Sequence, residues 1–382
     1  MTQPKNFAFG EDEKMLRDTA RKFLEDNLPT DKLHKLVASN PDLYREPESI
    51  WDRDLWQQIV ELGWTTVIVP EENGGMGMSL VALTALVEES GRAALPSPFL
   101  VTANSSLVLR ECSAPAAGRL LEEIAGGKTA SLAITPKTGS WAHDDCDVTL
   151  EGDTLNGTAW FVQDARKVDS FIVKAKSSKG IALYEVPAQA TGVEIAADTI
   201  VDLTRDQAHI NFNQVKVSGD QLLAEAGEGS AALSRAEPGI LTLVAADMCG
   251  AAEWQLQTTV EYARVREQFN RQIGFFQAIK HPLVNVMIMI DHAKSLTYNA
   301  ACAYDTEPEH AEKFARMAKS RASDVAAYAS NRSIQFHGGI GFTWECFVHL
   351  YTKRQKHNQI LYGDASYQRA KLADILMGPM AA

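Results

Sequence analysis

The spacing of apolar residues changes twice along this chain, and no other feature of the sequence limits its fold as strongly. Between Glu11 and Leu24 apolar residues recur every three or four positions, which is the period of an amphipathic helix. From about Lys128 short runs rich in β-branched and aromatic residues replace this pattern, and after about Gly229 the helical period returns. The order helical, β, helical predicts a chain of three parts.

The first part is expected to consist of helices and one long bent loop. Helices are predicted over 11–24, 51–62 and 80–91, the last two bounded by glycines. The loop at 67–77 carries a proline and three glycines, so we expect no helix within it.

The middle part is expected to be a β-sandwich or barrel. Strands are predicted over 130–135, 148–150, 158–162, 171–175, 181–186 and 209–215. Turn sequences such as Asn156-Gly157 separate these runs. No ten-residue helical pattern lies between the strands. A parallel Rossmann sheet, the usual fold for binding nicotinamide cofactors, is therefore disfavoured.

The last part is expected to be a four-helix bundle followed by a terminal helix. Its predicted helices are 241–266, 277–305, 309–335, 343–360 and 365–376. The fold class is therefore predicted as α+β multidomain, with an N-terminal helical domain at 1–126, a middle β domain at 127–226 and a C-terminal bundle at 227–382.

Composition excludes several classes of partner. The 382 residues include 37 basic and 49 acidic side chains, for a net charge of −12, which disfavours nucleic acid and anionic membranes. The five scattered cysteines form no C-x-x-C pair and are interpreted as reduced thiols. The first residues lack the apolar core of a signal peptide, and no 18-residue apolar window occurs, so we expect a cytoplasmic protein. The nine histidines form no H-x-x-x-H pair, and no metal site is predicted.

Three sequence motifs resemble those of acyl-CoA dehydrogenases. The run Arg266-Glu267-Gln268-Phe269-Asn270-Arg271-Gln272-Ile273-Gly274-Phe275-Phe276-Gln277, followed by His281, resembles the family's R-x-x-F-G-x-x-I-x-x-F-Q…H signature. The run Gln335-Phe336-His337-Gly338-Gly339-Ile340-Gly341-Phe342 resembles Q-x-x-G-G-x-G-[FY], and 62–77 resembles the N-terminal L-G…P-E-x-x-G-G-x-G loop. The motifs occur in the family's order and span essentially the whole chain.

This resemblance implies an FAD enzyme whose flavin lies between the β domain and the bundle. Arg266, with Phe269 and Gln277, would bind the pyrophosphate, because a planar guanidinium forms paired hydrogen bonds with phosphate oxygens. The alternative for Arg266 is a surface ion pair. A neighbouring subunit would contribute the remaining contacts through Gln335, Gly338 and Gly339.

The resemblance also assigns flavin contacts to the β domain, on a loop containing Thr135 and Ser140 and on a strand containing Phe161, Val162 and Gln163. Phe161 and Val162 could equally form an ordinary pair in the β core. Pro136 replaces the acidic residue that follows the threonine in the family, which leaves backbone contacts to the flavin possible.

The family's reaction removes the proton next to the thioester and passes hydride to the flavin, and it needs a carboxylate base. Gly363 and Ile240 stand at the two positions where the family carries that glutamate. Three interpretations remain open. Asp364 could act as a shorter base, although it also suits a helix N-cap. Glu237 could be recruited, although Pro238 and Gly239 argue against an ordered helix there. Otherwise this chain has no base.

The resemblance implies an acyl-CoA substrate, formation of a trans-2-enoyl-CoA and an electron-transfer flavoprotein as acceptor. The assembly would be a homotetramer or an α2β2 heterotetramer with a related subunit. Leu361-Tyr362-Gly363-Asp364-Ala365 resembles the bacterial branch that includes heteromeric steroid side-chain dehydrogenases, which suggests ring-bearing substrates in lipid and steroid degradation. The alternatives are a non-catalytic subunit that completes the flavin site, or a related flavoenzyme with other chemistry.

Overall fold

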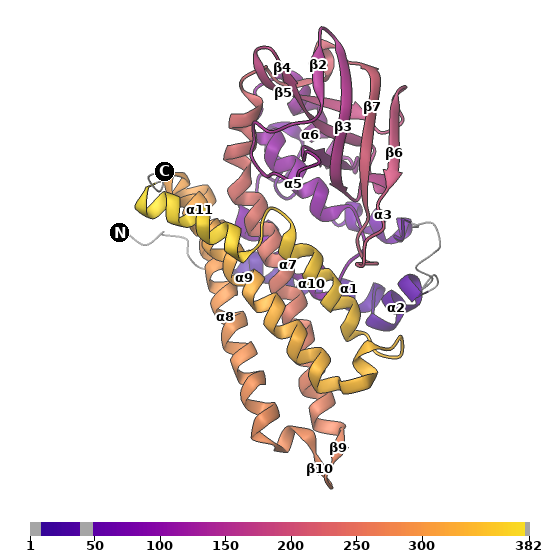
Figure 1. Ribbon diagram of the computed structural model, residues 1–382, viewed down its shortest axis with the longest axis vertical. Helices are drawn as coiled ribbons and strands as arrows, with labels where there is room; N and C mark the ends of the chain where they lie inside the picture. Colours follow the sequence, from indigo (N-terminus) through magenta and orange to yellow (C-terminus); the bar gives the residue numbers. More distant parts are fainter. Residues whose placement is uncertain (1–8, 39–48, 379–382) are drawn as a thin grey trace.

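Helices from both ends of the chain pack together beside a sheet formed by its middle (Figure 1). The computed structural model describes residues 9–38 and 49–378. The predicted fold class is confirmed, with helical N- and C-terminal parts around a central β-sheet domain. The prediction about a signal peptide concerns residues outside the described ones.

Within residues 9–38 and 49–126, the N-terminal part contains six α-helices. They are α1 (Glu11–Asn27), α2 (Thr30–Ala38), α3 (Arg53–Glu61), α4 (Leu80–Arg92), α5 (Phe99–Arg110) and α6 (Pro115–Ala125). The three helices predicted individually are α1, α3 and α4. α5 is buried from Phe99 to Leu109, so it has no polar face and its sequence carries little helical periodicity. The expectation of no helix in the loop at 67–77 was wrong, because Glu71–Asn73 form a 3-10 turn that ends at Gly74 with φ 76°.

The middle part forms one eight-stranded sheet. Its strands are β1 (Ala130–Ala133), β2 (Thr149–Glu151), β3 (Thr154–Gln163), β4 (Ser170–Ser177), β5 (Gly180–Pro187), β6 (Val193–Ala197), β7 (Gln207–Lys216) and β8 (Leu222–Ala224). The strand order is β6-β7-β3-β2-β4-β5-β8, with β1 parallel to β4. The β2–β4 contact is also parallel, and all other pairs are antiparallel.

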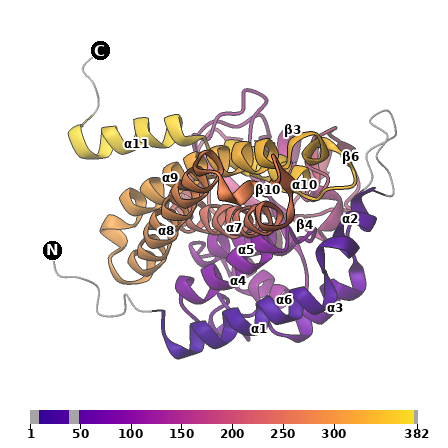
Figure 2. The ribbon, with the colours of Figure 1, turned by 90° about the horizontal axis from the view of Figure 1, so that it is seen from below.

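The C-terminal part contains α7 (Gly229–Val265), α8 (Gln277–Thr306), α9 (Pro308–His337), α10 (Val348–Ile360) and α11 (Ala365–Met377). The short strands β9 (Glu267–Gln268) and β10 (Arg271–Gln272) form a hairpin between α7 and α8. Seen from below, α7 runs between the N-terminal helices and the pair α8 and α9 (Figure 2). With 37 residues, α7 is about 55 Å long and extends from the sheet to the hairpin (Figure 1).

The helix α7 continues through Pro238 and Gly239, so the argument against an ordered helix there was wrong. Tertiary packing outweighs the local cost of both residues. A Cβ atom on Gly239 would lie 2.9 Å from Leu107 and 3.2 Å from the Tyr304 ring, so glycine permits the close approach of these neighbours. The carbonyl of Pro238 accepts a hydrogen bond from the Thr242 hydroxyl.

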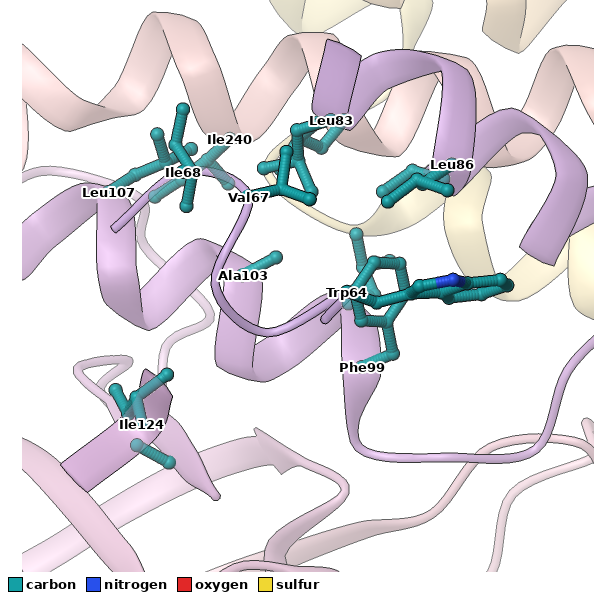
Figure 3. Close-up of a cluster of buried hydrophobic side chains, with 14 of the residues drawn as sticks. Trp64, Val67, Ile68, Leu83, Leu86, Phe99, Ala103, Leu107, Ile124 and Ile240 are labelled. Atoms are coloured by element: carbon teal, nitrogen blue, oxygen red, sulfur yellow. The ribbon is translucent and has the colours of Figure 1, made fainter. Parts of the chain in front are cut away.

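A hydrophobic core fills the space between α4, α5 and α7. Figure 3 shows Leu83 and Leu86 of α4 above Phe99 and Ala103 of α5, with Ile240 of α7 beside Leu107. The helices α4 and α7 cross in backbone contact, because a Cβ on Gly250 would lie 1.8 Å from the carbonyl oxygen of Glu88. This close crossing leaves no room for a ligand between the two helices at that point.

A buried ion cluster joins the β domain to the bundle. Asp247 of α7 accepts hydrogen bonds from Arg354 of α10 at 2.5 and 3.0 Å and from Arg205, which precedes β7, at 3.0 Å. Arg354 also donates to the Thr204 hydroxyl. The attraction of both arginines lowers the pKa of the Asp247 carboxyl against the opposing effect of burial. The cluster therefore fixes α10 relative to the sheet.

Candidate functional site

Two adjoining cavities lie between the β domain and the bundle. They share four lining residues, Ile134, Thr135, Trp141 and Tyr362. The Trp141 and Tyr362 rings pack with centroids 4.8 Å apart, and we call this ring pair, which lines both cavities, the Trp141–Tyr362 partition. We call the cavity that reaches Gln163 the first cavity and the one that reaches Glu237 the second.

The first cavity is partly open to solvent and collects three of the predicted cofactor residues. Thr135, Phe161 and Gln163 line it. An irregularity in the β3–β7 pairing between Ala159 and Val162 gives Phe161 a φ of 57° and leaves its ring 38% exposed. Val162 is 1% exposed and packs in the β core. Its side chain therefore lies in the core, as in the alternative to a flavin contact given above.

A chain of hydrogen bonds orients the Gln163 amide. Its Nε2 atom donates to the carbonyl of Phe161 and to Oε1 of Gln207, both at 2.9 Å. Its Oε1 atom lies 2.5 Å from Nε2 of His357 on α10. Burial lowers the pKa of His357 to about 4, so the neutral ring donates from Nε2. Because both amide hydrogens of Gln163 are in use, this residue can only accept a hydrogen bond from a ligand.

The first cavity also holds an unsatisfied acceptor. Asn104 is 3% exposed, and its Oδ1 atom has no hydrogen-bond partner among the residues at 9–38 and 49–378. A buried acceptor without a donor costs free energy unless a ligand or water supplies one. The N–H group on the edge of a flavin ring is such a donor, so the residues present fit the family's cofactor.

The second cavity lies against a segment at 139–147 that we call the strap. Ser140, the last predicted β-domain contact, lines it together with Trp141 and His143 of the strap. The carbonyl of His143 accepts a hydrogen bond from Ser230 of α7, which ties the strap to the bundle. Leu233, Glu237 and Ile240 of α7 form the opposite wall.

Glu237 is the carboxylate that lines the second cavity, and it is already engaged. Its Oε2 atom lies 2.9 Å from Nη2 of Arg316 on α9 and 3.4 Å from Nε2 of His143. The charge of Arg316 and the contact with His143 lower the Glu237 pKa, although burial acts in the opposite direction. A carboxylate held in its ionised form by a guanidinium is a weak base, so this geometry disfavours Glu237 as a proton acceptor.

Asp364 caps α11 and is exposed. Its Oδ1 atom accepts a hydrogen bond of 2.9 Å from the backbone N–H of Tyr367. Gly363 before it has a φ of 90°, and a Cβ atom there would lie 2.2 Å from the Tyr367 ring. The structure therefore gives Asp364 the capping geometry, and Asp364 does not line either cavity.

A buried lysine holds the segment that forms the cavity wall. Lys319 of α9 is fully buried, and its ammonium donates to the carbonyls of Gln359 and Gly363 at 3.1 and 3.0 Å. Burial lowers the pKa of Lys319 to about 7. These bonds fix the segment that carries Tyr362 into the cavities.

The other predicted cofactor residues lie at the far end of the bundle. Arg266 and Phe269 belong to the hairpin region after α7, and Gln277 begins α8. The end of α9 lies beside them, because the ring of His337 stacks on Tyr262 at 4.4 Å. The predicted residues of this second group are all exposed, namely Arg266, Phe269, Gln277, Gln335, Gly338 and Gly339.

The two groups of predicted cofactor residues are thus separated within one chain. Ile240, at the second cavity, and Arg266 are 26 positions apart, about 39 Å along a helix axis. Figure 1 shows the hairpin at the opposite end of α7 from the sheet. The Arg266 guanidinium forms no ion pair within the described part of the chain. The alternative interpretation of Arg266, a surface ion pair, therefore finds no partner residue there. One dinucleotide could contact both kinds of group only if a second chain supplied one of them.

Four residues of the site were missed in the sequence. They are Trp141, His143, Lys174 and His357. These residues come from segments far apart in the chain, and no local motif in the sequence indicated that they belong to the site. Over the described ranges, no three His, Cys, Asp or Glu side chains gather as metal ligands. None of the helices in those ranges is long and apolar enough to span a membrane.

Comparisons with known proteins agree with this architecture. The family model for the N-terminal domain of acyl-CoA dehydrogenases matches residues 10–128, and the model for their C-terminal domain matches residues 242–377. The acyl-CoA dehydrogenase IpdE2 of Mycobacterium tuberculosis is 30% identical over 90% of this chain and 91% of its own length. The mitochondrial short-chain specific acyl-CoA dehydrogenase of Mus musculus is 27% identical over 96% of this chain and 90% of its own length.

A solved structure of the Tcur3481-Tcur3483 steroid ACAD superimposes with a TM-score of 0.85 at 28% identity, covering 97% of this chain and 98% of the other. The two matched family models and the nearly full-length similarity to IpdE2 agree with the order of domains seen here. This chain therefore belongs to the acyl-CoA dehydrogenase family, whose cofactor is FAD.

Proposed function

We propose that this chain is one subunit of an FAD-dependent acyl-CoA dehydrogenase in which a second, related chain supplies the carboxylate base. One observation carries the proposal. By the motif resemblance, Gly363 and Ile240 stand where the family carries its glutamate base, and Glu237, which lines the second cavity, is paired with Arg316. The name of the Tcur3481-Tcur3483 steroid ACAD supports a role in a two-component enzyme of steroid or lipid degradation.

The separation of the two residue groups supports a cofactor site shared between chains. A flavin ring would be held by the β-domain group, namely Thr135, Ser140, Phe161 and Gln163. The pyrophosphate and adenosine of a second cofactor, whose ring lies on the neighbouring chain, would be held by the exposed group at the other end of the bundle, namely Arg266, Phe269, Gln277, Gln335, Gly338 and Gly339. Exposed apolar side chains at the hairpin suit a subunit contact, since Phe269 is 85% exposed and Phe275 55%.

A bound FAD would supply the hydride acceptor, so that loss of a hydride from the β carbon and of the α proton to a carboxylate would turn the acyl-CoA into a trans-2-enoyl-CoA. In this chain, the residues of the first cavity would orient the ring, and the Trp141–Tyr362 partition would exclude water. An electron-transfer flavoprotein as acceptor, an α2β2 heterotetramer in place of a homotetramer, and a cytoplasmic location belong to the same proposal.

The test begins with the complex purified from its native host. We expect a second chain of similar size that carries a glutamate at the equivalent of Ile240 or Gly363. We expect the flavin of the complex to bleach on anaerobic addition of a substrate acyl-CoA, and this chain alone to show no bleaching. Bleaching by this chain alone would refute the second-chain base, and a complex unable to bind FAD would refute the proposal as a whole.

A matched pair of variants tests the shared cofactor site. Arg266→Leu should lower the FAD affinity of the complex by about tenfold or more, the effect of one lost charge-assisted hydrogen-bonding group. Arg264→Leu removes an exposed cation two positions away and should leave the affinity unchanged. Equal affinity in both variants would remove Arg266 from the site.

A further inference from the structure

A buried ammonium without a close counter-ion lines the second cavity. Lys174 of β4 is 2% exposed, and its Nζ atom donates to the carbonyl of Ala142 in the strap at 3.2 Å. Within the described ranges no carboxylate oxygen lies within 4 Å of this ammonium, and the acidic residues of the strap act on it only from farther away. Burial lowers the pKa of Lys174, and an anionic ligand beside it would favour the charged ammonium again, so this position suits such a ligand.

The other charged groups of the cavity do not neutralise Lys174. Glu237 on the opposite wall is bound by Arg316, which also donates to the side chain of Gln368. His143 lies beside the same carboxylate. Because Arg316 already pairs with Glu237, the carboxylate that lines the cavity is engaged, and Lys174 lines the cavity without an ion pair to it.

The remaining lining is apolar and aromatic. Leu233 and Ile240 of α7 face the Trp141 and Tyr362 rings across the cavity. A ligand that fits must therefore present an anionic end to Lys174 and an apolar body to this wall. Ile240 also belongs to the buried hydrophobic core, where Figure 3 shows it beside Leu107.

We propose that the second cavity binds a carboxylate carried on a short apolar chain, with the Lys174 ammonium as its counter-ion. The carboxylate can belong to a free short-chain acid or to the far end of an acyl group on CoA. The proposal does not depend on which chain carries the dehydrogenation base. It assigns a ligand to a cavity that lacks that base.

Two pairs of probes test the charge preference by titration calorimetry on the full-length chain, together with any chain that copurifies. Butyrate and butyramide differ in the charge of a free ligand, and glutaryl-CoA and butyryl-CoA differ in a carboxylate at the far end of the acyl group. We expect the charged member of at least one pair to bind about tenfold tighter or more. Preference in the first pair alone identifies a free acid as the ligand, and preference in the second identifies an acyl-CoA.

Lys174→Met should abolish the preference and leave the neutral probes unchanged, and it should fold well because it removes a buried charge. Lys176→Met, an exposed lysine two positions along the same strand, should keep the preference. The proposal is refuted if neither pair shows a charge preference in the wild-type protein. It is also refuted if Lys174→Met weakens glutaryl-CoA and butyryl-CoA equally, because Lys174 would then bind the phosphates of CoA. A butyryl-CoA affinity without charge preference refutes this inference and leaves the proposed function intact.

Discussion

The Nε2 atom of His357 lies 2.5 Å from the Oε1 atom of Gln163, and this contact joins the bundle to the last residue of β3. The same helix carries His349, which is also buried and packs edge-on against Trp344. Burial, with nearby positive charge, lowers the pKa of both rings to about 4. Both are therefore neutral in the folded protein at pH 7.

These two histidines should make the protein less stable in mild acid. Between pH 6.5 and about 4 the unfolded chain binds a proton at each histidine and the folded chain does not, so folding becomes less favourable as the pH falls. The loss should be on the order of 2 kcal/mol for each group by pH 5. Urea unfolding at pH 7 and pH 5 measures it, and a His349→Gln/His357→Gln variant should lose less stability between the two. An unchanged difference would show that these rings do not titrate as described.

Asp364 should matter for stability and not for turnover. Asp364→Asn keeps an N-cap acceptor and should change the free energy of unfolding little, and Asp364→Ala should lower it by about 1 kcal/mol. Steady-state turnover of the purified complex should be normal in both variants once folding is confirmed. If Asp364→Asn were stable and inactive, Asp364 would be the base and the proposed second-chain base would be wrong.

A side chain at Gly363 should not be tolerated. Gly363→Ala places a Cβ at φ 90° against the Tyr367 ring and should cost roughly 1–3 kcal/mol. Gly152→Ala is the control, because Gly152 has a φ of 62° and nothing within 4 Å of the added atom. Thermal unfolding of both variants separates the steric contact from backbone strain. Equal losses would show that the Tyr367 ring moves aside freely.

Breaking the buried ion cluster should be far more costly than breaking a surface pair. Asp247→Asn leaves Arg354 and Arg205 without their carboxylate and should lower the free energy of unfolding by roughly 3–5 kcal/mol. Asp324→Asn breaks the exposed pair with Arg369 and should cost less than about 1 kcal/mol. Urea unfolding of both variants makes the comparison, and similar small losses would mean that the cluster adds little to the junction of sheet and bundle.

The three-part fold was predictable because amphipathic elements leave a periodic signal. α1 has one buried face with Ala20 and Leu24 on it, and its sequence shows that face directly. The start of α7 was not predictable, since it is buried almost throughout from Ala232 to Ala252 and contains Pro238 and Gly239. Its conformation depends on neighbours such as Tyr304 that the local sequence does not reveal.

The candidate site was predictable only where a motif marks it. The resemblance pointed to Thr135 and Gln163, which line the first cavity, and the roles of the exposed residues around Arg266 stay predictions. The charged residues of the strap suggest only exposure, yet its Trp141 ring packs against the Tyr362 ring, more than 200 positions away. A contact between residues so far apart in the chain depends on the tertiary fold, and no local pattern in a single sequence reveals it.

The length of α7 has a consequence for how such a protein can change over evolution. Substitutions near Ile240 can alter the lining of the chain's own second cavity without disturbing the hairpin at the other end of α7. A duplicated gene could therefore lose its acid–base chemistry at one end and still serve a sister polypeptide with the other. Two paired copies could then specialise, one in acid–base chemistry and one in cofactor binding, through mutations at only one end of α7.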